Sequence, residues 1–293
     1  PPFTPRRPVF YFYMYSLSSC WNSSRHTDGR AMLREIRDLG FEYAELSHGI
    51  RISLLPGIFE AVQAGEIKIS TLHNFCPLPI GVTHAAPNIF KFTSLEARER
   101  ENAWRYSLKT LETAERLKAR LVVLHMGAID MKDYTDRLLE MAENGLKETP
   151  KFEKLCLEAS EKRAKYKTRH MEFASDMLHR LAIEATTRGL LLGIENREAV
   201  EEIPFDDEFP FFLKDFPEPC IGYWHDTGHA QIKENIGFLN HIMHLENMAD
   251  RLVGFHVHDV KFPGTDHMPP GQGAIDFAAL KQFVKPGHIK VLE

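Results

Sequence analysis

Short strand-like runs alternate with helical stretches along the whole chain, and this alternation constrains the fold more than any other feature. Several runs are apolar almost throughout, which is typical of parallel strands buried on both faces. The eight expected strands are Phe10–Tyr15, Tyr43–Ser47, Lys68–His73, Leu121–His125, Leu190–Glu195, Ile221–Asp226, Val253–His258 and Lys290–Glu293. The expected helices are Thr27–Leu39, Leu54–Ala64, Ser94–Ala119 with Ser94 as its N-cap, two or three helices within 130–188, a short one before Ile221, Phe238–Asp250 and Asp276–Phe283.

Eight strand–helix units predict an α/β protein with a (β/α)8 TIM barrel. A doubly wound sheet is the alternative, but the chain has no GxGxxG or GxxxxGK[ST] phosphate-binding loop. We expect an irregular N-terminal tail over residues 1–9 and a single barrel domain over residues 10–293. No helical pattern follows the last strand, so the final helix is expected to be missing.

Composition excludes several classes of protein. The net charge of −5 argues against nucleic acid as a partner, because such proteins usually carry a basic face. No apolar run reaches the roughly 18 residues of a membrane span. The four cysteines form no CxxC pair, which indicates a reducing, cytoplasmic location. The Phe-rich stretch 205–216 suits barrel packing or a subunit contact, so a homo-oligomer stays open.

Ionisable residues gather at the ends of the expected strands. In a TIM barrel the C-terminal strand ends form the active-site face, and strands three to eight end in His73, His125, Glu195, Asp226, His256 and Glu293. Burying such groups unpaired is costly, and a metal ion removes that cost. Carboxylate and imidazole ligands suit Mn²⁺, Zn²⁺, Co²⁺ or Fe²⁺. Glu45 and His48 at strand two are weaker candidates, and His258 is expected just outside the set.

Four segments of the chain carry a resemblance to a known family. They are GIEN at strand five, HDTGH at strand six, FHVHD followed by HMPPGQGAIDF at strand seven, and VLE at strand eight. In this order and spacing they resemble the xylose isomerase-like TIM barrel superfamily of sugar phosphate isomerases and epimerases, of which endonuclease IV is a related branch. The likeness covers essentially the whole chain.

The resemblance implies a site and a reaction. Its four metal ligands would be Glu195, Asp226, His256 and Glu293, and Glu195 and Glu293 would also be the acid/base pair. The implied activity is a divalent-metal-dependent isomerase or epimerase acting on a sugar or sugar-derived keto compound. One Mn, Zn, Co or Fe ion would stabilise a metal-bound enediolate while the carboxylates transfer the proton. A small-molecule carbohydrate is the expected substrate.

Further residues are expected to contact the substrate. The expected contacts to its oxygens come from His229, His267, His125 and His73. Arg197 and Lys261 are weaker candidates for binding a carboxylate or phosphate group, with a rim ion pair as the simpler interpretation for both.

Two other activities stay open. The first is an endonuclease IV-like phosphoester hydrolase with more than one zinc, for which His73, His125 and His267 occupy the places of the added histidines. That branch has an aspartate two residues before the loop histidine, where this chain has Thr265. The second is a metal-dependent lyase or dehydratase acting on a keto-sugar.

Overall fold

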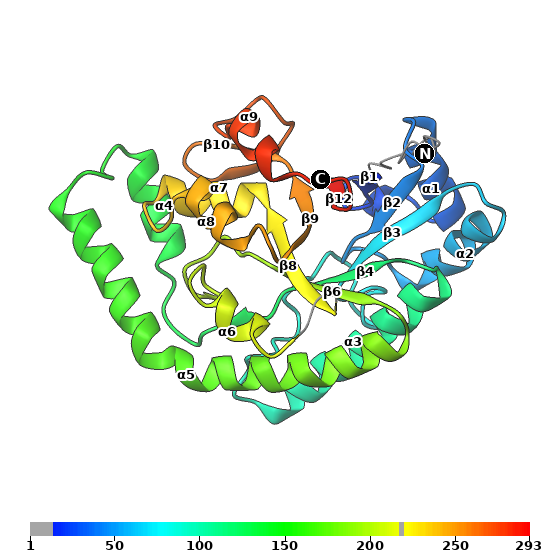
Figure 1. The fold of residues 1–293 in the computed structure, drawn as a ribbon, viewed down its shortest axis with the longest axis horizontal. Helices are drawn as coiled ribbons and strands as arrows, with labels where there is room; N and C mark the ends of the chain where they lie inside the picture. Colours follow the sequence, from blue (N-terminus) through cyan, green and yellow to red (C-terminus); the bar gives the residue numbers. More distant parts are fainter. Residues whose placement is uncertain (1–13, 217–219) are drawn as a thin grey trace, which may run out of the picture.

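The computed structural model describes residues 14–216 and 220–293. Its centre is a closed barrel with the strand order β1-β12-β9-β8-β6-β4-β3-β2 (Figure 1). Every neighbouring pair in this barrel is parallel, so the predicted (β/α)8 fold is confirmed. The barrel strands are β1 (Met14–Ser18), β2 (Tyr43–Leu46), β3 (Lys68–His73), β4 (Leu121–Leu124), β6 (Leu191–Glu195), β8 (Ile221–Asp226), β9 (Leu252–Val257) and β12 (Ile289–Leu292).

The expected strands coincide with these barrel strands. Lys68–His73 and Ile221–Asp226 agree at both ends, and five others shift by one residue at one or both ends. The first expected strand overlaps β1 only at Met14 and Tyr15. Its residues 10–13, and the expected tail over residues 1–9, lie outside the described residues.

The helices follow the strands around the barrel, together with two short antiparallel sheets, β5–β7 and β10–β11. The helices are α1 (Gly29–Asp38), α2 (Leu55–Gln63), α3 (Ala97–Arg116), α4 (Thr135–Glu143), α5 (Pro150–Thr187), α6 (Phe209–Leu213), α7 (Thr227–Asn235), α8 (His241–Met248) and α9 (Phe277–Leu280). The single turns of 3-10 helix are η1 (Ser23–Arg25), η2 (Ile52–Leu54) and η3 (Lys281–Phe283). The added strands are β5 (Gly127–Ala128), β7 (Glu202–Ile203), β10 (Asp259–Lys261) and β11 (Thr265–Met268). Among the described residues, no helix is both long and apolar enough to cross a membrane.

One helix was missed, and one expected N-cap was wrong. Helix α7 was not predicted, because Asp226 ends strand β8 and also begins this helix, where its side chain accepts a hydrogen bond from the amide of His229. Ser94 is not the N-cap of α3, which begins at Ala97. The Ser94 hydroxyl instead accepts a bond from the amide of Glu96 and donates one to Glu99, which forms a turn ahead of the helix.

Helix α5 extends beyond the barrel wall, and its N-terminal half stands beside α4 (Figure 1). A small apolar cluster joins the two helices, with Leu138 of α4 and Phe152 of α5 both buried in it. Helix α4 also lies against the β10–β11 hairpin, since a side chain at Gly264 would collide with Leu139. This second layer therefore supports loops on the side of the barrel where the strands end.

Trp224 fills the barrel interior. Its side chain is fully buried in a cluster with Leu121, Val123, Ile289 and Val291. Gly254 makes room for the indole, because a Cβ there would lie 2.3 Å from Cζ3 of Trp224. The indole ring centre lies 5.0 Å from that of His256. Trp224 therefore packs directly beneath the polar residues at the strand ends, inside the barrel.

A buried histidine cluster lies between β8 and α8. His225 points into the helix layer, as the strand alternation predicts, and its Nε2 lies 2.9 Å from Nε2 of His241. The Tyr223 hydroxyl lies 2.7 Å from Nδ1 of His225 and 2.8 Å from Nε2 of His244. Burial, followed by His244, lowers the pKa of His241 to about 4, and burial lowers that of His244 to about 4.

We expect these histidines to make the fold sensitive to acid. The unfolded chain binds a proton at each near pH 6.5, whereas the folded chain does so only near pH 4. Acid therefore favours unfolding in that window, on the order of 2 kcal/mol per histidine between pH 7 and 5. Urea unfolding should show a smaller pH dependence in His241→Gln than in the parent chain. Equal pH dependence in the two proteins would contradict this account.

Candidate active site

The four residues expected to bind metal converge at the C-terminal ends of the strands. Nδ1 of His256 lies 2.6 Å from Oε1 of Glu195, 3.8 Å from Oε2 of Glu293 and 3.9 Å from Oδ2 of Asp226. These residues come from β6, β8, β9 and the end of β12, and each side chain is buried. One imidazole nitrogen therefore faces three carboxylates inside the barrel.

The surroundings keep these carboxylates charged. Burial raises the pKa of Glu195, but the His256 imidazole outweighs it and holds this pKa well below its usual range. Burial also raises the pKa of Glu293, but His256 and the hydrogen bond to His267 outweigh burial and lower this pKa to about 2. The pKa of Asp226 is also lowered, because His229 and His258 outweigh its burial. Three negative charges thus surround a single imidazole.

The donors around Nδ1 of His256 are of the kind that a divalent ion takes, and members of this set occur in two groups with the spacing of a metal site, Glu195 with Asp226 and His229, and His256 with Glu45 and Glu293. Metal–ligand bonds of roughly 2.0–2.2 Å place the ligand atoms of one ion about 3 Å apart. The separations of 2.6, 3.8 and 3.9 Å around Nδ1 of His256 lie near that spacing. Mixed carboxylate and imidazole donors suit Mn²⁺, Zn²⁺, Co²⁺ or Fe²⁺.

Asp226 is oriented by hydrogen bonds from two sides. Its Oδ1 accepts a bond of 2.7 Å from the amide of His229, and both oxygens lie within 3.1 Å of Nε2 of His258. The amide of His267 donates to Nδ1 of His258, so Nε2 carries the hydrogen that Asp226 accepts. A Cβ at Gly228 would lie 2.0 Å from the His258 ring. The glycine of the DTGH segment therefore lets His258 reach Asp226, and His258 lies just outside the four residues, as expected.

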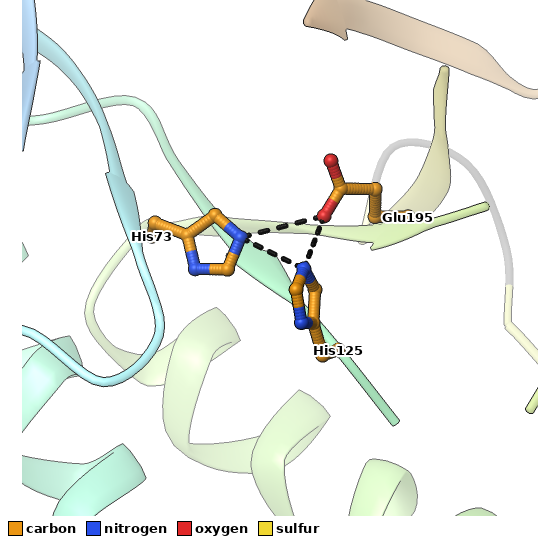
Figure 2. A group of neighbouring side chains, drawn as sticks. All are labelled: His73, His125 and Glu195. Carbon is orange, nitrogen blue, oxygen red and sulfur yellow. Dashed lines mark hydrogen bonds and ion pairs between the residues drawn. The ribbon is translucent and has the colours of Figure 1, made fainter. Parts of the chain in front are cut away.

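A second group forms around the other oxygen of Glu195 (Figure 2). Nε2 of His73 and Nε2 of His125 lie 3.0 Å apart, and they lie 3.3 and 2.6 Å from Oε2 of Glu195. His73 donates from Nδ1 to the carbonyl of Asn74, which turns the Nε2 lone pair toward this group. Burial, Arg197 and His73 hold the pKa of His125 well below its usual range. These three atoms also form a group with the spacing and chemistry of a metal site.

Arg197 lies beside this second group as a buried cation. Its Nη1 lies 2.8 Å from Nε2 of His125, 3.2 Å from Nδ1 of His229 and 3.6 Å from Oε2 of Glu195. Its Nε donates to Glu202 at 3.0 Å. The sequence predicts that Arg197 either binds an anionic substrate group or forms an ion pair at the rim of the barrel. The structure instead places its ion pair inside the site.

The other residues expected to contact the substrate, His229, His267 and Lys261, lie at different distances from the four central residues. His229 lies with Nδ1 3.5 Å from Oδ2 of Asp226. His267 is half exposed on β11, with Nε2 3.7 Å from Oε2 of Glu293, and its ring stacks on His258 at 4.4 Å. Asp266 and Glu293 raise the pKa of His267 to about 11. Lys261 is exposed on β10, and within the described parts of the chain no hydrogen bond or ion pair joins it to these residues.

Two residues that the sequence indicated only weakly also belong to the site. Both carboxylate oxygens of Glu45 lie 3.1 Å from Nε2 of His256. The ring of His48 lies edge-on to that of His73, with centres 4.8 Å apart. A signal for Glu45 was present, because it is the only charged residue in the buried strand Tyr43–Leu46.

Comparisons with known proteins agree with this fold. The family model described as "Xylose isomerase-like TIM barrel" matches residues 33–287. Solved structures with similar folds include a D-tagatose 3-epimerase-like protein (18% identity, TM-score 0.66, covering 95% of this chain and 89% of that one). Another is 3-keto-D-glucoside 4-epimerase, YcjR, from E. coli (16% identity, TM-score 0.65, covering 96% of this chain and 91% of that one). A third is the IOLI protein with a bound zinc atom (15% identity, TM-score 0.62, covering 95% of this chain and 87% of that one). A comparison with curated proteins finds no match.

Proposed function

This chain belongs to the xylose isomerase-like TIM barrel family, and on that basis we propose that it is a metal-dependent isomerase or epimerase of a small sugar or sugar-derived keto compound. The observation that carries the proposal is the position of Nδ1 of His256, which faces carboxylate oxygens of Glu195, Asp226 and Glu293 at 2.6, 3.9 and 3.8 Å. Epimerases among the structural neighbours support a sugar as the substrate.

Glu195, Asp226, His256 and Glu293 would hold one divalent ion, which we propose to be Mn, Zn, Co or Fe. The zinc described for the IOLI neighbour supports a metal in this fold. When bound, the ion supplies polarisation of the substrate oxygens, which acidifies the adjacent carbon-bound proton.

Glu195 and Glu293 would transfer the proton. They come from β6 and the end of β12, which β8 and β9 separate in the barrel order, so they approach the space above Trp224 from two directions. One carboxylate would remove a proton from carbon, and the other would return one to the opposite face or to the neighbouring carbon. His229, His125 and His73 would bind substrate oxygens, and His267 would close the rim above Glu293.

A second candidate is a multi-zinc phosphoester hydrolase. It is favoured by one observation, the convergence of His73, His125 and Oε2 of Glu195 within 3.3 Å of one another (Figure 2). The guanidinium of Arg197 argues against it, because a positive charge already lies 2.8 Å from Nε2 of His125. The net charge of −5 also disfavours a nucleic acid substrate. We therefore place the isomerase first.

Metal content and hydrogen exchange test this choice. We expect elemental analysis of protein purified without chelator to find about one Mn, Co, Zn or Fe ion per chain. Incubation in D₂O with D-tagatose, D-fructose or L-ribulose should place deuterium beside the carbonyl, as NMR would detect. Chelation should stop the exchange, and the metal should restore it. Failure to bind metal would refute the proposal. Two or three zinc ions with cleavage of abasic-site DNA would favour the hydrolase.

A further inference from the structure

We propose that Glu45 is a positioning residue that orients His256 toward the metal, an inference that rests on the proposed metal centre. Glu45 lies on β2 and is fully buried. Its two carboxylate oxygens each lie 3.1 Å from Nε2 of His256. Strands β1 and β12 separate β2 from β9 in the barrel order, so this contact crosses the interior of the barrel.

The contact determines which imidazole nitrogen is available to an ion. Both nitrogens of His256 face carboxylates, Nδ1 at 2.6 Å from Oε1 of Glu195 and Nε2 at 3.1 Å from Glu45, so without an ion both can donate a hydrogen bond. An ion bound at Nδ1 would replace the hydrogen there, while Nε2 would keep the hydrogen that Glu45 accepts. In a neutral imidazole the lone pair then lies on Nδ1. Nδ1 is the atom that faces Glu195, Asp226 and Glu293. Carboxylates that fix the tautomer of a ligating histidine in this way also raise its affinity for metal.

The barrel holds Glu45 in place for this contact. The Thr71 hydroxyl donates to Oε2 at 2.7 Å, and the Ser18 hydroxyl donates to Oε1 at 3.2 Å. Ser18, Glu45 and Thr71 are register partners on three adjacent parallel strands, which turns their side chains to the same face. In the described part of the chain, the only ion-pair partner of this buried carboxylate is His256. Its position is therefore set from three sides and directed at one imidazole.

Metal affinity tests the role of Glu45. We expect Glu45→Ala to weaken Zn²⁺ binding, measured by competition with a chelator, by up to about 100-fold. Glu45→Gln should weaken it by roughly 10-fold, because the amide oxygen still accepts a bond from Nε2. Thr113→Ala is the control, since Thr113 is a buried polar residue of α3 whose hydroxyl donates to the carbonyl of Lys109 in the same helix, away from Glu45. The control should bind Zn²⁺ as the parent chain does.

A spectroscopic measurement separates positioning from a general loss of structure. The parent chain loaded with Co²⁺ should give one strongly shifted, exchangeable N–H proton signal from the coordinated imidazole. Its exchange with water should be slow beside Glu45 and fast in Glu45→Ala. If Glu45→Ala does not fold, Glu45→Gln carries the same test with nearly unchanged volume.

The outcomes distinguish this inference from the proposed function. If the parent chain binds one ion and both Glu45 variants keep its affinity and its proton signal, only the role of Glu45 is refuted. If the parent chain binds no Zn²⁺ or Co²⁺, the proposed metal centre fails, and the inference fails with it.

Discussion

Glu195→Gln should reduce kcat by roughly 10³-fold or more, because it removes a proposed base and a proposed metal ligand together. No other carboxylate of the site has contacts on both oxygens to histidines of both groups. Oε1 lies 2.6 Å from His256, and Oε2 lies 2.6 Å from His125. Glutamine preserves the shape of the side chain but cannot accept a proton from carbon. Glu195→Gln should therefore lower kcat through the chemical step and change the stability of the fold much less.

Deuterium exchange into a ketose and metal content should be measured together on this variant. Lost exchange with metal retained would assign Glu195 to proton transfer, and lost metal would assign it to binding the ion. Glu198→Gln is the matched control, since Glu198 lies in the same loop and is partly exposed. The control should keep its activity. Full activity of Glu195→Gln would remove this residue from the mechanism.

Local sequence patterns predicted much of the fold. Lys68–His73 and Ile221–Asp226 were located at both ends, because each is a short run with β-branched or aromatic residues that ends in an ionisable residue at the barrel rim. Helix α7 was not predicted, because it begins directly at the end of strand β8. Asp226 ends a strand and caps a helix, with no loop between the two elements to mark the change. The periodic pattern of apolar residues does not show where a strand ends and a helix begins when one residue belongs to both.

The site was predictable where one strand end supplies one residue. The resemblance pointed to Glu195, Asp226, His256 and Glu293 because each stands in a short motif, and the structure brings these four side chains together. The contact between Glu45 and His256 spans 211 positions of the chain and depends on barrel closure, which no local pattern encodes. The place of Arg197 similarly depends on Glu202, which the short strand β7 brings back to it.

Arg197→Gln should raise the zinc content of the protein from about one ion per chain to about two. An ion bound by His125 and Oε2 of Glu195 would lie within about 5 Å of Nη1 of Arg197. At that distance a divalent ion and the guanidinium repel each other by roughly 7 kcal/mol with an effective dielectric constant of about 20. The pair of Arg197 with Glu202 and burial among polar groups keep that charge in place. Removing the charge should let His73, His125 and Glu195 bind a second ion.

Zinc titration followed by elemental analysis measures this change. Arg197→Lys is the control, because it preserves a positive charge and should keep the content near one ion. The double variant with Glu202→Gln avoids leaving the Glu202 carboxylate buried without a partner if the single variant folds poorly. A content that stays at one ion without the guanidinium would show that Arg197 does not exclude a second metal. If the parent chain itself binds two ions, the proposed one-metal site is wrong. The charge of Arg197 would then not exclude a second metal, and it would no longer argue against the multi-zinc hydrolase.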